Sequence, residues 1–142
     1  MGMRVTRKNG YTLQVATNNF NPADATTYYI GAPHGGTPSS VDGNYRMYIP
    51  KAGTVSICYG VVFSATTTGT NENSTISLRK NSTTDYQIST TIDNSQTAAA
   101  FSTSSLNIPV AAGDYIELKW AAPTWVTNPT GVRISAQIYI QA

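Results

Sequence analysis

Charged residues are scarce in this sequence. They make up 11% of the chain, well below the roughly 25% of an average soluble domain. The nine Lys and Arg residues exceed the seven Asp and Glu residues by two, and the basic residues are scattered along the chain. A nucleic-acid-binding surface needs clustered basic side chains to contact phosphates, so we expect no nucleic-acid partner.

Cysteine and histidine each occur once, as Cys58 and His34. A single cysteine excludes an intrachain disulfide, and these two residues are too few for a zinc site, which needs three or four ligands. Cys58 lies in an apolar segment and is expected to be buried and unreactive. His34 stands in the sequence Pro33-His-Gly-Gly36, which resembles the oxyanion-hole loop of esterases, but no Gly-x-Ser-x-Gly motif accompanies it. We therefore interpret His34 as a loop residue.

The few carboxylates show no catalytic or metal-binding spacing. Asp85, Asp93 and Asp114 are far apart in the chain and lack the spacing of calcium ligands. Asp114 and Glu117 are the closest pair that a glycosidase could use, but the pattern places them on a turn and on an outward strand position. We expect no enzyme activity, no metal and no cofactor.

Long hydrophobic runs are also missing. No run approaches the ~20 apolar residues of a membrane helix, and the N-terminus shows no hydrophobic core of a secretory signal. We expect no insertion into a membrane.

The residues that are abundant favour β-structure. The sequence has 9 Tyr, 11 Gly and 7 Pro, together with many Thr, Ser and Asn residues, a combination of strand formers and turn formers. Residues 115–120 alternate strictly, with Ile116, Leu118 and Trp120 on one side and polar residues on the other, as in a half-buried strand. Alternation or apolar runs predict strands at 26–31, 44–49, 54–66, 75–80, 86–92, 98–110, 115–120 and 132–140.

About eight strands with no persistent helical period predict an all-β fold. The expected architecture is a two-sheet antiparallel β-sandwich with jelly-roll topology. In the longest strand, 54–66, both sides are apolar, with Val55, Ile57, Tyr59, Val61 and Phe63 predicted to share one of them. This strand is expected at the centre of a sheet. Residues 1–22 are interpreted as an N-terminal segment, linker or anchor, although 11–15 alternate, and residues 23–142 as the jelly-roll domain.

Three short motifs occur in an order that resembles a known family. They are Tyr48-Ile-Pro-Lys-Ala-Gly-Thr-Val55, Ile76-Ser-Leu-Arg-Lys-Asn81 and Val110-Ala-Ala-Gly-Asp-Tyr-Ile-Glu-Leu118. This succession resembles the C1q/TNF-like jelly roll. The wider pattern, including residues 121–130 and Ile138-Tyr-Ile140, is similar to C-terminal domains of tailed-phage fibre and other virion proteins. The resemblance implies a homotrimer located on a virion; that family often binds calcium, but its acidic cluster is not evident here.

Aromatic residues are the candidate contact sites. Trp120, Tyr59 and Tyr139 are predicted to lie at the subunit interface, since aromatic residues are enriched in interfaces; the alternative for Trp120 is a place in the sandwich core. Trp125 lies in a loop between Pro123 and Pro129, where it either stacks on a sugar of a cell-surface glycan or caps one end of the sandwich.

Tyr45 and Tyr48, close in sequence to Tyr28 and Tyr29, either line a ligand groove or form a subunit contact. The leading hypothesis for function is a trimeric tip domain of a phage tail fibre, without enzyme activity, that recognises a host-surface receptor. Two alternatives remain: a trimeric capsid decoration or head-fibre protein anchored through residues 1–22, and a carbohydrate-binding module.

Overall fold

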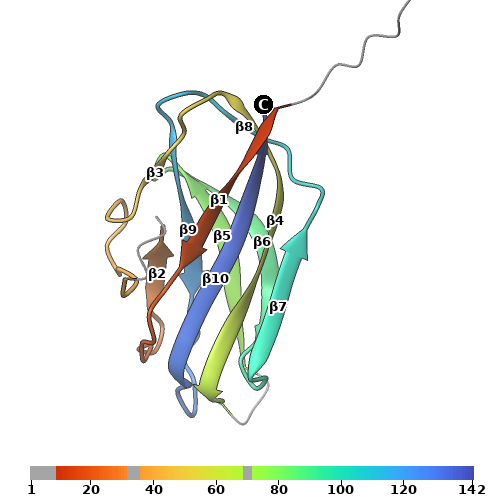
Figure 1. Cartoon of the computed structure of the whole chain (residues 1–142). Helices are drawn as coiled ribbons and strands as arrows, with labels where there is room; N and C mark the ends of the chain where they lie inside the picture. The colour runs from red at the N-terminus through yellow and green to blue at the C-terminus, as the bar shows by residue number, and fades with distance from the viewer. Residues whose placement is uncertain (1–8, 32–35, 69–71) are drawn as a thin grey trace, which may run out of the picture.

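The computed structural model describes residues 9–31, 36–68 and 72–142. Two antiparallel sheets of five strands each pack face to face (Figure 1). The first sheet contains β1 (Gly10–Ala16), β10 (Thr130–Gln141), β4 (Gly53–Thr66), β7 (Ala98–Thr103) and β8 (Ile108–Val110). The second contains β2 (Thr27–Ile30), β3 (Met47–Tyr48), β9 (Tyr115–Ala121), β5 (Asn73–Lys80) and β6 (Thr84–Asp93).

The ten strands occupy eight positions. β2 and β3 follow one another along the same edge of β9, and β7 and β8 do so along the same edge of β4. The resulting orders, β1-β10-β4-β7 and β2-β9-β5-β6, place early strands beside late ones in both sheets. Two sheets linked in this way are a jelly roll. The predicted all-β sandwich and its topology are confirmed, and the structure has ten strands where the sequence predicted about eight.

β4 is central, as predicted, because it lies between β10 and the β7–β8 pair. The predicted sharing of one face by Val55 and Ile57 is wrong. Tyr139 pairs with Ile57 but Ile140 pairs with Val55, so Ser56 is an extra residue that forms a bulge. The bulge turns Val55 towards the core together with Cys58 and leaves Ile57 on the outside.

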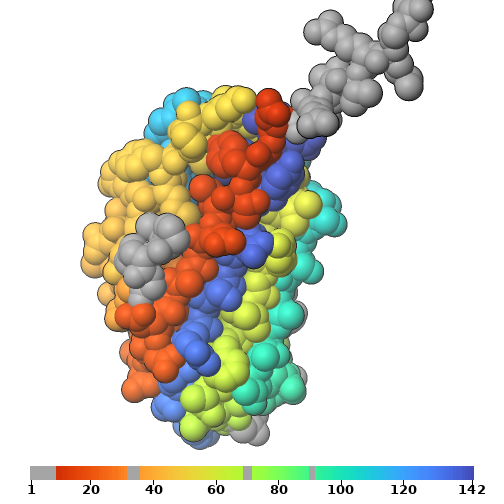
Figure 2. Space-filling model, in the orientation of Figure 1, coloured from red at the N-terminus to blue at the C-terminus, as the bar shows by residue number. Residues whose placement is uncertain are grey.

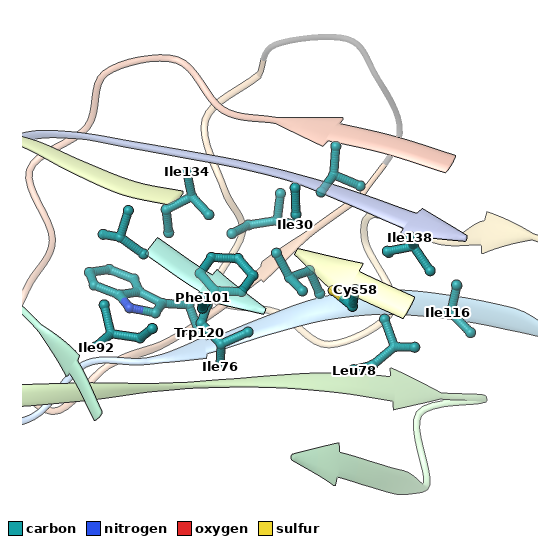
Figure 3. Packing of buried hydrophobic residues seen from close by; sticks show 14 of the residues in the cluster. Ile30, Cys58, Ile76, Leu78, Ile92, Phe101, Ile116, Trp120, Ile134 and Ile138 are labelled. Atoms are coloured by element: carbon teal, nitrogen blue, oxygen red, sulfur yellow. The ribbon is translucent and has the colours of Figure 1, made fainter. Parts of the chain in front are cut away.

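The core lies between the sheets and is built from alternate residues of both (Figure 3). Trp120 on β9 is 0% exposed, and its ring lies 5.9 Å from those of Phe20, Tyr28 and Trp125. Its indole N–H donates to Ser74 Oγ at 2.7 Å, so the one polar atom of the side chain is satisfied. Trp120 therefore belongs to the core, and its prediction as an interface residue is wrong.

The predicted boundary at residue 22 does not follow the fold. β1 pairs with β10 over its whole length, from Gly10 opposite Gln141 to Ala16 opposite Ser135. Phe20, 8% exposed, is part of the core. β1 and Phe20 therefore belong to the sandwich, and the interpretation of residues 1–22 as a separate linker or anchor is wrong for this part. Residues 1–8 lie outside the described residues. Deleting residues 1–22 would remove an edge strand.

Candidate functional site

The outward side of β1, β10, β4 and β7, here called the first-sheet face, is not covered by any described segment (Figure 2). Strand pairing sets its residues in rows across the sheet. One row contains Ala16, Ser135, Val61 and Ala100, and the next contains Gln14, Gln137, Tyr59 and Ser102. A third contains Thr12, Tyr139 and Ile57, and a shorter one Arg133, Phe63 and Ala98.

Apolar side chains run along the middle of the first-sheet face. Ile57, Tyr59, Val61 and Phe63 of β4 all point outward, with small or uncharged residues on both sides. The only charged side chain among the described outward residues of these strands is that of Arg133. Its guanidinium carbon lies 4.5 Å from the centre of the Phe63 ring, so even this charge packs on an aromatic residue.

A shallow groove of about 620 Å³ crosses this face beside Tyr59. Gln14, Ala16, Val61, Ser135 and Gln137 also line it. Tyr59 is 46% exposed, and its hydroxyl donates to Gln137 Oε1. Most of the other lining side chains are small or amide groups.

Two of the three predicted interface residues lie on this face. Tyr59 stands at the groove, and Tyr139 is half-buried because its ring lies where a Cβ of Gly10 would be. Trp120 is in the core instead. The structure places Tyr59 and Tyr139 on one uncovered surface, and their contact with another subunit stays a prediction.

The outward side of β9, β5 and β6, the second-sheet face, is built differently. Arg79 forms ion pairs with Asp42 at 3.0 Å and with Asp85 at 2.7 Å, and Lys119 pairs with Asp85 at 2.6 Å. Glu117, which is buried, accepts hydrogen bonds from the backbone N–H groups of Gly43 and Tyr45 at 3.0 and 3.1 Å. These contacts hold the described segment 36–46 against the second sheet.

Two carboxyl groups of this face have pKa values shifted in opposite directions, although burial acts in the same direction on both. For Glu117, burial raises the pKa, and the neighbouring Asp42 adds to this, whereas the N–H groups of Tyr45 and Gly43 oppose it. For Asp85, burial also acts to raise the pKa, but hydrogen bonds from Lys119 and Arg79 outweigh it and the pKa is lowered. Glu117 thus carries its charge at a cost, whereas Asp85 is stabilised as an anion.

Trp125, predicted as an exposed ligand residue, is 4% exposed. Its ring packs 5.9 Å from that of Trp120, and its backbone N–H donates to Asp24 Oδ1 at 3.1 Å. Its indole N–H has no acceptor among the described residues. The predicted sugar-stacking role is wrong because the ring closes the end of the core, which was the alternative interpretation.

Tyr45 and Tyr48 have different surroundings. Tyr45 donates its hydroxyl proton to the carbonyl oxygen of Thr37 at 2.7 Å, so it fixes the 36–46 segment. Tyr48 is 58% exposed, and its ring centre lies 5.6 Å from that of Tyr115. Arg46 joins them: Nη1 donates to the Tyr48 hydroxyl at 3.1 Å, and the guanidinium carbon lies 4.5 Å from the centre of the Tyr115 ring.

We call these three residues the Arg46–Tyr48–Tyr115 cluster. Sequence reasoning selected Tyr48 but missed its two partners. Arg46 had a local signal, since it lies two residues before Tyr48. Tyr115 had none, because only the pairing of β3 with β9 brings it opposite Tyr48.

Among the described residues, no group of three or more His, Cys, Asp and Glu side chains is placed to hold a metal ion. His34 lies outside the described residues. Cys58 is buried, and burial raises the pKa of its thiol to about 12, so a thiolate nucleophile is not available at neutral pH. Within the same ranges, no helix is long and apolar enough to cross a membrane.

No protein-family model matches the sequence, and none of the curated proteins compared with it is significantly similar. Evidence about function therefore comes from the two faces and the Arg46–Tyr48–Tyr115 cluster.

Proposed function

We propose that this chain is a non-enzymatic jelly-roll domain of a virion, a tip or receptor-binding domain of a phage tail fibre, that forms a homotrimer and binds a host-surface receptor. The observation that carries the proposal is the uncovered first-sheet face, with its apolar row along β4. The virion location and the number of three subunits come from the resemblance of residues 26–140 to C1q/TNF-like and phage-fibre domains.

The first-sheet face has the chemistry of a subunit contact. Ile57, Val61 and Phe63 point outward next to Tyr59, and burying such side chains contributes about 25 cal/mol per Å² of apolar surface. While water covers this row, its apolar side chains contribute no burial free energy to the fold. Contiguous apolar surface of this kind is typical of interaction sites.

The composition of the face favours a second copy of this chain as its partner. Apart from Arg133, its outward side chains are apolar, hydroxyl or amide groups. Such a surface meets a copy of itself with little repulsion between like charges, and hydroxyl and amide groups both donate and accept hydrogen bonds. A partner selected by charge would find almost nothing to recognise here.

Light scattering at micromolar concentration tests the assembly. We expect a mass about three times the 15.2 kDa of the chain. A mass near 15.2 kDa would reject the homotrimer.

Adhesion is tested separately, by the adsorption of fluorescently labelled protein to intact host cells. We expect saturable binding that unlabelled protein displaces. A stable trimer that adsorbs to no host cell would overturn the receptor-binding role and leave the assembly standing.

A further inference from the structure

The Arg46–Tyr48–Tyr115 cluster combines an exposed aromatic ring with a cation that is held in place. Besides its contacts to the two tyrosines, Arg46 donates from Nε to the carbonyl oxygen of Gly43 at 3.0 Å. Tyr115 is also fixed, because its hydroxyl donates to Ser82 Oγ at 2.8 Å, which in turn donates to Asp42 at 2.9 Å. The guanidinium is therefore oriented before any ligand arrives, which lowers the entropy cost of binding.

Arg46 forms no ion pair among the described residues, and its only acidic influence there is a minor electrostatic attraction to Glu117. Arg79, Lys80 and Lys119 each pair with an aspartate, but no described carboxylate lies within ion-pair distance of Arg46. Glu117 is directed to the N–H groups of Gly43 and Tyr45. Asp114 accepts hydrogen bonds from Asn81 and from the N–H of Ala111.

Arg46 also retains free donors. Nε and Nη1 each make one hydrogen bond, whereas Nη2 has no acceptor in the part of the chain that the structure describes. A guanidinium with donors left on two neighbouring nitrogens can bind both oxygens of a carboxylate. Beside the guanidinium, Tyr48 offers an exposed ring, and aromatic rings supply the apolar contact of ligand sites whose few polar groups set specificity.

We propose that the Arg46–Tyr48–Tyr115 cluster binds a carboxylate-bearing sugar, with Arg46 contacting the carboxylate and Tyr48 the face of the sugar ring. Tyr115 acts as a positioning residue, because its ring supports the guanidinium and the edge of Tyr48. This inference rests on the proposed receptor-binding role and names the class of receptor, an acidic glycan of the host surface. A ligand that is only an anion would leave the exposed ring of Tyr48 unused.

Isothermal titration of the full chain with trigalacturonic acid, the neutral trisaccharide galactotriose and inorganic phosphate tests the proposal. We expect the acidic trisaccharide to bind about tenfold or more tightly than the neutral one, since charge-assisted hydrogen bonds to one carboxylate are of that magnitude. Arg46→Gln should abolish this preference, and Tyr48→Ala should weaken binding of the acidic trisaccharide. Lys51→Gln removes an exposed cation from the turn after β3 and serves as the matched control, with unchanged affinity.

Three results would overturn the site. These are equal affinity for the acidic and neutral trisaccharides, an unchanged preference in Arg46→Gln with a wild-type unfolding midpoint, and phosphate binding as tightly as the acidic sugar. If the protein adsorbs to host cells but binds no acidic sugar, this site is rejected and the adhesion role stands. If it adsorbs to no cells yet binds the acidic sugar through Arg46, the adhesion role is rejected and this site stands.

Discussion

The outer faces of the two sheets differ in chemical character. On the second sheet, Arg79, Asp85 and Lys119 form ion pairs, and Glu117 holds the 36–46 segment through two backbone N–H groups. On the first sheet, Tyr59, Val61 and Phe63 stand outward with no described segment over them. The second-sheet face finds its partners within the chain, whereas the first-sheet face does not.

This contrast makes the first-sheet face the candidate for a contact between copies of the chain. Polar groups that are already paired gain little from a new partner, because any new contact must first break an existing one. An apolar row that is in contact with water gains from any surface that removes the water.

The largest expected effect comes from placing a charge on the first-sheet face. Val61→Glu should reduce the mass in light scattering to that of one chain, because an unpaired charge buried in an interface costs several kcal/mol. Ser77→Glu, an outward position opposite Lys119 on the second sheet, is the matched control and should leave the mass unchanged. If Val61→Glu assembles like the wild type, the first-sheet face is not the contact.

Glu117→Gln should lower the free energy of unfolding by about 1–3 kcal/mol, measured by urea denaturation, because one of two partly buried backbone donors loses its acceptor. Glu72→Gln is the control. Both oxygens of Glu72 accept from the single N–H of Val126, so the one remaining oxygen of Gln suffices and the change should stay below about 0.5 kcal/mol. Equal losses in the two variants would contradict the role of Glu117 as a double acceptor.

The smallest effect concerns pH. The pKa of Asp85 is lowered from its ordinary value of 3.8, so its ion pairs stabilise the fold above that pH and are lost as the pH falls through the lowered pKa. Asp85→Asn should be less stable than the wild type at pH 7 by about 0.5–1 kcal/mol, a difference that shrinks below about pH 4. Urea unfolding at several pH values measures this.

Glu117 should show the opposite sign. Its pKa is raised above 4.5, so its titration favours the fold most at acid pH, and this contribution is lost as the pH rises through the raised pKa. In Glu117→Gln, the free energy of unfolding plotted against pH should lack this decline. An identical pH profile in the wild type and in both variants would contradict the two assignments.

Alternation along the chain predicted the fold well because a strand's two sides are set by neighbouring residues alone. The inward positions of Ile116 and Leu118 followed from this period. The bulge at Ser56 did not, since it depends on how β4 meets β10 at Ile140. Likewise, Met47–Tyr48 is shorter than the strand predicted for 44–49 because Gly43 and Tyr45 are held by Glu117 instead of by a neighbouring strand.

The candidate sites were harder to predict. An exposed and a buried tryptophan look alike in a sequence, and both Trp120 and Trp125 are in the core. Tyr59 and Tyr139 were selected as aromatic residues, and the register places both on the outer side of the first sheet. Their environment depends on residues from β1, β4 and β10 that are remote in sequence.

The sequence by itself determined the all-β class, the jelly-roll architecture and the central place of β4, because turn residues and the two-residue period act locally. Only the tertiary structure decided which polar residues are paired, which aromatic residues are exposed and where Arg46 meets Tyr115. These contacts join segments that are remote in sequence, such as Asp24 and Trp125, which are 101 residues apart, and their geometry depends on strand register. The single bulge at Ser56 changes which side chains of β4 point outward.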